Sequence, residues 1–197
     1  MSANDNDIKS ALFNSFDPLH PQKIDGYFSD VLFADPVEIF APLELVWSVM
    51  TDFAAYPSWN PLNRFFQLDT VAKPGERVTF GVSWGPYTKD DHLVPLDELK
   101  TALTQHERLT VWEPNRCLAY ADDFGQWHRA ERVQFISKLP NGNTRYHTYE
   151  RWAGLITPLI RLAYNDKTQA GFNACSAALK VRAEALTNKN KFRDIIK

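Results

Sequence analysis

Glu131 and Glu150, which fall in two neighbouring predicted strands, are the residues of this sequence best suited to proton-transfer chemistry. Glu150 lies in the run 144–152, where successive side chains point to opposite faces of a strand. One face carries Tyr146, Thr148, Glu150 and Trp152. Apolar and aromatic neighbours disfavour the charged form of a carboxylate, so such a glutamate can hold its proton near neutral pH and act as a general acid or base.

A structural role is the competing interpretation of both glutamates. Alternation in the preceding strand groups Glu131 with Trp127, Arg129, Val133 and Phe135. Arg129, Arg132 or Arg151 can neutralise either carboxylate, and an arginine-paired carboxylate in a sheet is more often structural than catalytic. Glu150 and Glu131 therefore stay candidates for catalysis, with an ion pair as the favoured alternative.

The sequence lacks the motifs that accompany metal or cofactor chemistry. Four of its histidines fall singly on different predicted strands or loops, at His92, His106, His128 and His147. None of them forms an HExxH or an i,i+4 pair, and no nucleotide-binding glycine pattern or GxSxG occurs. Cys117 and Cys175 are far apart and have no zinc-site companions. We expect no cofactor and no metal.

Composition narrows the possible partners and location. The 197 residues suit one domain, and 22 basic against 24 acidic side chains give a net charge of −2 without long blocks of one sign. This balance argues against a nucleic-acid partner. No apolar run reaches the ~20 residues that span a bilayer, and the first residues are polar and acidic, unlike a signal peptide. We therefore expect a cytoplasmic protein without stable membrane insertion.

Hydrophobic periodicity divides the chain into three parts: 1–35 as an N-terminal arm or short helix, 36–187 as the folded domain, and 188–197 as a flexible tail. A strand at 37–40 ends before Pro42, which suits the start of a helix, and a second short helix follows at 53–56. Alternating segments then predict several strands. One long helix at about 159–186, rich in alanine, closes the domain.

This order of elements resembles the START-like, or SRPBCC, superfamily and most closely its polyketide cyclase/dehydrase-like branch. The matching stretches include Ala41-Pro42 before Val46-Trp47, Trp59-Asn60-Pro61, Trp112-Glu113-Pro114 and Glu150-Arg151-Trp152-Ala153-Gly154. The resemblance covers roughly residues 36–187. It implies the α+β helix-grip fold, in which a curved antiparallel sheet of six to seven strands wraps around the C-terminal helix and two short helices follow the first strand.

The resemblance also implies which side chains line a cavity. It places the Glu150 face of its strand toward the long helix, and the expected hairpin register adds the Glu131 face of the preceding strand. The ligand-binding residues expected on this basis are Trp84, Leu118, Tyr120, Trp127, Phe135, Tyr146, Thr148, Glu150 and Trp152. The same aromatic side chains also suit ordinary core packing.

Three functions are compatible with these residues. The first is binding of a small hydrophobic or aromatic molecule, oriented by Glu150, Tyr146 and Tyr120. The second is a cofactor-independent cyclase, dehydratase or isomerase that uses Glu150 or Glu131. The third is a protein-interaction module whose cavity is filled by its own side chains. We expect the first, in a monomer or homodimer whose partner is a small hydrophobic molecule.

Overall fold

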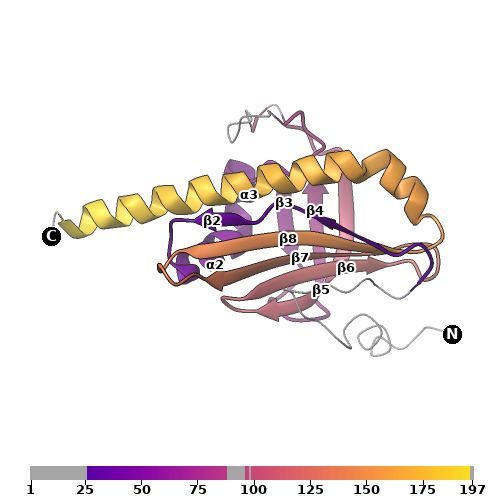
Figure 1. Ribbon diagram of the computed structural model, residues 1–197, viewed down its shortest axis with the longest axis horizontal. Coiled ribbons are helices and arrows are strands. Elements are labelled where there is room, and N and C mark those ends of the chain that lie inside the picture. Colours follow the sequence, from indigo (N-terminus) through magenta and orange to yellow (C-terminus); the bar gives the residue numbers. More distant parts are fainter. Residues whose placement is uncertain (1–25, 88–95, 98, 196–197) are drawn as a thin grey trace.

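The computed structural model describes residues 26–87, 96–97 and 99–195. An antiparallel sheet curves around the long helix α3 (Thr157–Ile195), which lies across its concave face (Figure 1). Two shorter helices, α2 (Leu43–Thr51) and η1 (Phe53–Ser58), follow β2 and pack into the same core. This is the expected α+β helix-grip architecture. Most of the expected N-terminal arm, residues 1–25, lies outside the described residues.

Eight strands from the described residues form the sheet, and paired strands run antiparallel. They are β1 (Asp30–Phe33), β2 (Val37–Ile39), β3 (Asn63–Leu68), β4 (Arg77–Val82), β5 (Leu103–Glu113), β6 (Cys117–Asp123), β7 (Arg129–Lys138) and β8 (Thr144–Ala153). Their order is β1-β8-β7-β6-β5-β4-β3, and β2 also pairs with β8. β1 and β2 therefore share one edge of the sheet, and β3 forms the other.

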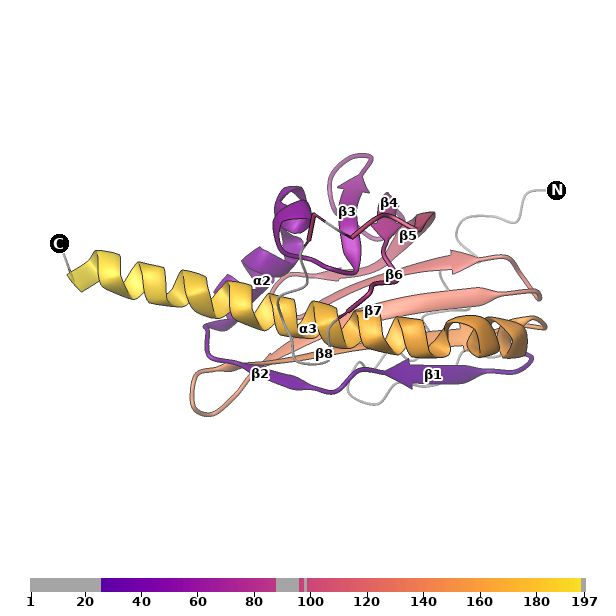
Figure 2. The ribbon, with the colours of Figure 1, turned by 90° about the horizontal axis from the view of Figure 1, so that it is seen from above.

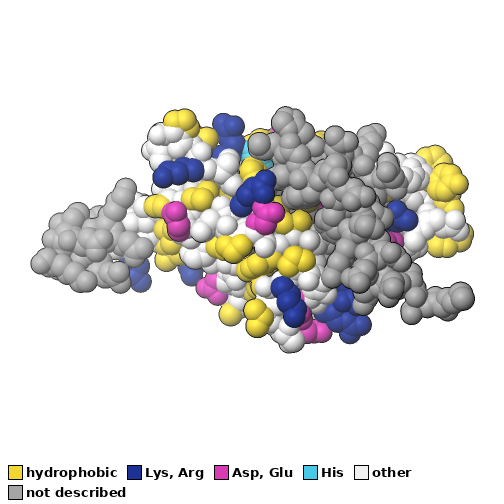
Figure 3. Space-filling model, turned by 90° about the horizontal axis from the view of Figure 1, so that it is seen from below, with side chains coloured by type: hydrophobic (Ala, Val, Ile, Leu, Met, Phe, Trp, Pro, Cys, Tyr) yellow, Lys and Arg dark blue, Asp and Glu magenta, His cyan; other side chains and the backbone are white. Residues whose placement is uncertain are grey.

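Alternation of side chains gives the sheet two apolar faces. The concave face joins α2, η1 and α3 in the main core, to which Leu118, Tyr120, Ile136, Tyr146 and Trp152 belong. The convex face carries a second, smaller cluster made of Val111, Cys117, Ala119, Val133, Phe135 and Tyr149. Figure 3 views the molecule from this convex side, where hydrophobic side chains lie between charged ones.

The short helices owe their form to proline and aromatic residues. Pro42 precedes the first turn of α2, which holds Glu44 near the positive end of the helix dipole. The chain then tightens into the 3-10 turn η1, where Tyr56 donates a hydrogen bond to the Met50 carbonyl (2.7 Å). The Phe53 ring stacks 4.4 Å from Phe66. The aromatic residues around η1 therefore anchor the helices to β3.

Helix α3 packs on the sheet through a narrow stripe of small and apolar side chains. Phe172, Cys175, Leu179 and Ala183 are each no more than 2% exposed. A methyl group on Gly171 would lie only 2.7 Å from the Leu62 side chain, so a small residue is needed where the helix passes this loop. The C-terminal end of α3 projects past the sheet (Figure 2).

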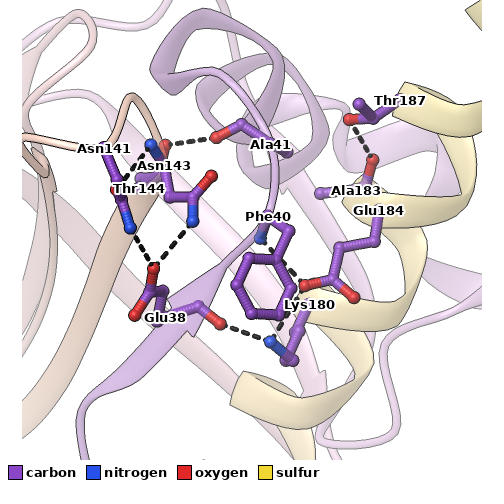
Figure 4. A network of polar contacts seen from close by, with 10 residues as sticks. All are labelled: Glu38, Phe40, Ala41, Asn141, Asn143, Thr144, Lys180, Ala183, Glu184 and Thr187. Atoms are coloured by element: carbon purple, nitrogen blue, oxygen red, sulfur yellow. Dashed lines mark hydrogen bonds and ion pairs between the residues drawn. The ribbon is translucent and has the colours of Figure 1, made fainter. Parts of the chain in front are cut away.

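A polar network fastens the middle of α3 to strand β2 (Figure 4). Lys180 donates a hydrogen bond to the Glu38 carbonyl and forms an ion pair of 2.9 Å with Glu184. Glu184 accepts a hydrogen bond from the Phe40 backbone N–H (2.9 Å). The Glu38 carboxylate in turn accepts from Asn143 (2.7 Å) in the β7–β8 hairpin. The network thus connects helix, edge strand and hairpin.

The sequence-based prediction of the fold is confirmed, with differences in detail. In the part of the chain that the structure describes, the sheet has eight strands instead of six to seven. The strands β1 and β3 were not predicted, because they are only four and six residues long and β3 follows a proline-rich stretch. β1 lies inside the range that was assigned to the arm, and the α3 backbone stays helical to Ile195, through most of the range assigned to the tail.

Candidate functional site

A buried arginine, Arg132 on β7, forms the centre of the polar groups on the concave face. Its side chain is 5% exposed, and its guanidinium donates hydrogen bonds to Asn63 Oδ1 (2.8 Å) and the Tyr120 hydroxyl (3.1 Å). It also donates to Thr148 Oγ1 (3.3 Å). Phe172 of α3 lies under the guanidinium, with 4.4 Å from its carbon to the ring centroid. Sheet and helix therefore both contact this cation.

Arg132 is held by neutral groups. Within the described part of the chain, no carboxylate oxygen forms an ion pair with it at 4 Å or less. A buried charge normally requires compensation by nearby charges or several hydrogen bonds. Glu150, which is directly opposite Arg132 in the β7–β8 register, supplies charge at longer range. The site therefore combines a fixed positive charge with nearby, half-buried carboxyl groups.

Three carboxyl groups lie on the concave face around this arginine. Glu150 is the cross-strand neighbour of Arg132. Asp122 lies two positions after Tyr120 on the same face of β6, opposite Ala130. Glu107 on β5 pairs with Val78, a core residue of β4. All three side chains are half-buried.

The environment of these carboxyl groups favours their protonated forms. Burial raises the pKa of Glu150 to about 7, although the indole N–H of Trp152 and the charge of Arg132 lower it. Burial also raises the pKa of Asp122 to about 6. The pKa of Glu107 lies well above its usual range because of burial and the neighbouring charges of Asp122 and Glu150. At neutral pH Glu107 and Glu150 can therefore donate as well as accept hydrogen bonds, whereas Asp122 is mostly protonated only below about pH 6.

Two tyrosines complete the polar lining. Tyr120 is 1% exposed, and the centroid of its ring lies 5.3 Å from that of Phe66 and 5.1 Å from that of Phe80. Tyr146 is fully buried, and its hydroxyl donates a hydrogen bond to Gln134 Oε1 (2.9 Å). Burial raises the pKa of both hydroxyl groups, so they remain neutral. They add hydrogen-bonding groups to a wall that is otherwise aromatic.

The residues predicted on β4, β6 and β8 lie where the sequence placed them. Leu118, Tyr120, Tyr146 and Trp152 belong to the main core. Thr148 faces the same side, because it accepts a hydrogen bond from Arg132. Trp84 follows the end of β4 and lies 5.6 Å from the Tyr164 ring of α3. Glu150 lies on the concave face as expected.

The predicted orientation of β7 is wrong. Phe135 belongs to the convex cluster, and Trp127 is 56% exposed in the turn before the strand. Glu131 is fully buried on the convex side, where its carboxylate pairs with Arg151 and accepts a hydrogen bond from Thr110 (2.7 Å). Glu131 is therefore separated from Glu150 by the sheet, and the two cannot act together as acid and base.

Periodicity could not orient β7 because both of its faces are apolar, with Val133 on one and Ile136 on the other. The hairpin register that the sequence analysis expected was also wrong by one residue. Lys138 pairs with Thr144, and continuing this register places Arg132 opposite Glu150 and Glu131 opposite Arg151. Paired residues share a face of the sheet. The sequence analysis therefore named Arg132 only as a possible ion-pair partner, and it missed Gln134, Asn63, Glu107 and Asp122.

The described residues contain no group of three or more His, Cys, Asp or Glu side chains that are arranged to hold a metal ion. Among the helices formed by residues 26–87, 96–97 and 99–195, none is both long and apolar enough to cross a lipid bilayer.

The fold and the polar concave face define a helix-grip protein of the START-like class. The family model described as "Polyketide cyclase / dehydrase and lipid transport" matches residues 31–177. The chain belongs to this family, which confirms the resemblance seen in the sequence. None of the curated proteins matches the sequence.

Solved structures with the same fold have little sequence in common with this chain. The Zhui aromatase/cyclase from Streptomyces sp. R1128 is 16% identical with a TM-score of 0.59, over 79% of this chain and 94% of that chain. A START superfamily protein from Mycobacterium smegmatis is 16% identical with a TM-score of 0.54, over 80% of this chain and 98% of that chain. A norcoclaurine synthase from Thalictrum flavum is 9% identical with a TM-score of 0.56, over 82% of this chain and 96% of that chain. At these identities the likeness concerns the fold.

Proposed function

We propose that this protein binds a small hydrophobic or aromatic molecule that carries a carbonyl or hydroxyl group, between the concave face of the sheet and α3. The observation that carries the proposal is the gathering of Glu107, Asp122 and Glu150 around Arg132 within an aromatic wall. Binding sites for small molecules are mainly apolar with a few convergent polar groups. Family membership supports the same general activity.

The protonation state of the carboxyl groups determines which polar group of the ligand they would contact. With a pKa of about 7, Glu150 is protonated in a large fraction of molecules at neutral pH. A protonated carboxyl group donates a hydrogen bond to a carbonyl oxygen, and an ionised one does not. Arg132 already donates hydrogen bonds to Asn63 and Tyr120, so it is held in place at the polar end of the site. Glu150 can change its protonation state near neutral pH, so it provides the contact with the ligand that depends on pH.

Catalysis without a cofactor is the second candidate function. A general acid works best when its pKa is close to the working pH, and the pKa of Glu150 is in that range. In this case Glu150 would transfer a proton to or from an oxygen or carbon atom of a carbonyl substrate. Two of the structural neighbours are an aromatase/cyclase and a norcoclaurine synthase, which gives this alternative a precedent on the same fold.

Two naphthalene derivatives test the binding proposal through quenching of tryptophan fluorescence. The ketone 2-acetylnaphthalene accepts hydrogen bonds, and 2-ethylnaphthalene has the same shape without an oxygen. We expect the affinity for the ketone to fall as the pH rises through the pKa of Glu150, about 7, because the donor is lost. Glu150→Gln should remove this pH dependence, and 2-ethylnaphthalene should bind equally at all pH values. Absence of binding by both compounds would contradict the proposal and favour the interaction module with a filled interior.

Native mass spectrometry of the purified protein separates binding from catalysis. A binding protein should carry the same co-purified molecule in the wild type and in Glu150→Gln. An enzyme should accumulate a molecule of different mass in the variant, because loss of a general acid or base typically slows turnover by ~10²–10⁴-fold. The same molecule in both proteins would refute the catalytic alternative.

A further inference from the structure

Strands β7 and β8 each contribute one buried arginine, and among the described residues only one of the two has a carboxylate partner. In the β7–β8 register, Glu131 lies directly opposite Arg151, and Arg132 lies directly opposite Glu150. Glu131 and Arg151 form an ion pair on the convex face. Arg132 forms none at 4 Å or less with a carboxylate of the described chain, and Glu150 instead accepts a hydrogen bond from Trp152. Within this part of the chain, the guanidinium on the concave face therefore lacks a direct counter-ion.

The hydrogen bonds of Arg132 leave one of its nitrogens without an oxygen partner in the described chain. Nε donates to Thr148, and Nη1 donates to Asn63 and Tyr120. Nη2 carries two further N–H groups. Among the described residues its one acceptor is Cys175 Sγ at 3.8 Å, and a thiol sulfur is a weak acceptor. Nη2 is therefore the donor that an additional oxygen atom can satisfy.

Nη2 lies on the side of the guanidinium that faces α3. The three oxygen partners of Arg132 belong to β3, β6 and β8, and they hold Nε and Nη1 against the sheet. Cys175 and Phe172 are both residues of α3, and the Phe172 ring centroid lies 4.4 Å from the guanidinium carbon. The proposed function places the ligand between this helix and the sheet. Nη2 therefore borders the proposed binding region.

We infer that the ligand is a hydrophobic or aromatic carboxylic acid, bound as its carboxylate with one oxygen accepting a hydrogen bond from Nη2 of Arg132. The inference rests on the proposed function, because it concerns the same region between the sheet and α3. An uncompensated buried cation is unfavourable, so an anion is favoured beside it. The single charge of a carboxylate matches the single charge of Arg132, and a hydrogen bond between charged groups is stronger than one between neutral groups.

The neighbouring carboxyl groups do not exclude such an anion. Burial raises the pKa of Glu107 and that of Glu150, so both side chains are mostly protonated at about pH 6. In this form they repel a ligand carboxylate little, and their O–H groups can donate to its second oxygen. The concave face then carries Arg132 as a positive charge that a ligand can neutralise.

Calorimetric titration of the full-length protein at about pH 6 compares two probes of similar shape. 2-Naphthoate carries a carboxylate, which is ionised at this pH, and 2-acetylnaphthalene carries a neutral ketone in the same place. We expect 2-naphthoate to bind at least about tenfold more tightly, because hydrogen bonds to charged groups stabilise more than neutral ones. Equal affinities, or tighter binding of the ketone, would overturn the inference and leave the proposed binding function in place. Absence of binding by both probes would refute the proposed function together with the inference.

Arg132→Met assigns the preference to this arginine, because it removes the charge and keeps an unbranched side chain. It should weaken the binding of 2-naphthoate at least about tenfold more than that of 2-acetylnaphthalene. An equal loss for both probes would show a purely structural role and overturn the inference. Arg161→Met, which removes a half-exposed arginine from α3, is the matched control and should keep the preference. Loss of the preference in this control would also contradict the inference.

Cys175→Asp gives the answer if Arg132→Met does not fold. The introduced carboxylate lies beside Nη2 and takes the place of the carboxylate of the ligand. The preference for 2-naphthoate should therefore disappear in Cys175→Asp and remain in the neutral variant Cys175→Asn. A preference that persists in Cys175→Asp would overturn the inference, because the ligand carboxylate would then be recognised elsewhere.

Discussion

Replacing Glu150 with glutamine should make the protein more stable above neutral pH. Glutamine keeps the size of the side chain and an oxygen that can accept the Trp152 N–H hydrogen bond. It removes only the charge. In the wild type the charge of Glu150 lies on the concave face, where the carboxyl groups of Asp122 and Glu107 are also half-buried. No carboxylate–arginine ion pair at 4 Å or less would be lost among the described residues.

The size of the effect follows from the pKa. At ~1.4 kcal/mol per pKa unit, a rise from 4.5 to about 7 means that ionising Glu150 in the folded protein costs about 3 kcal/mol. Below pH 4.5 both the folded and the unfolded chain carry the proton, so the stabilising contribution of the raised pKa is fully present. It is lost as the pH rises through about 7.

Urea unfolding followed by tryptophan fluorescence measures this difference. At about pH 8 the free energy of unfolding of Glu150→Gln should exceed that of the wild type by up to ~3 kcal/mol, and at about pH 4 the two should agree. Glu131→Gln is the matched control on the convex face. It should lower the stability at about pH 8 by ~3–5 kcal/mol, because the buried Arg151 loses its carboxylate.

A loss of stability in Glu150→Gln at high pH would refute this reasoning. It would mean that Glu150 is ionised in the folded protein and that Arg132 stabilises the charge by more than burial destabilises it. A gain that does not depend on pH would also contradict it, because the effect would then come from packing instead of charge.

Two further predictions concern packing and hydrogen bonding in the concave core. Ala183 is fully buried on α3, so Ala183→Leu should lower the free energy of unfolding by ~1–3 kcal/mol, whereas Ala170→Leu at an exposed position of the same helix should stay within ~0.5 kcal/mol of the wild type. Equal effects would show that the assigned helix face is wrong. Tyr146→Phe leaves buried Gln134 without its donor and should cost ~1–3 kcal/mol in urea unfolding, and a neutral result would rule out that hydrogen bond.

The sequence alone determined the architecture because its signals are local. Pro42 sets the start of α2, alternating side chains identify the long strands, and the spacing of Phe172, Leu179 and Ala183 identifies the C-terminal helix. The order of these elements then led to the family. The orientation of β8 was predicted correctly, because the stretch that contains Glu150 and Trp152 is one of those that resemble the family.

Only the tertiary structure decided which groups form the site. Strand β7 is apolar on both faces, so its pattern is equally compatible with either orientation, and a shift of one residue moves every side chain to the other side of the sheet. That shift places Arg132 beside Glu150 and moves Glu131 to the convex face. The raised pKa values of Glu107, Asp122 and Glu150 likewise depend on burial and on charges from separate strands, which are brought together only when the sheet folds around α3.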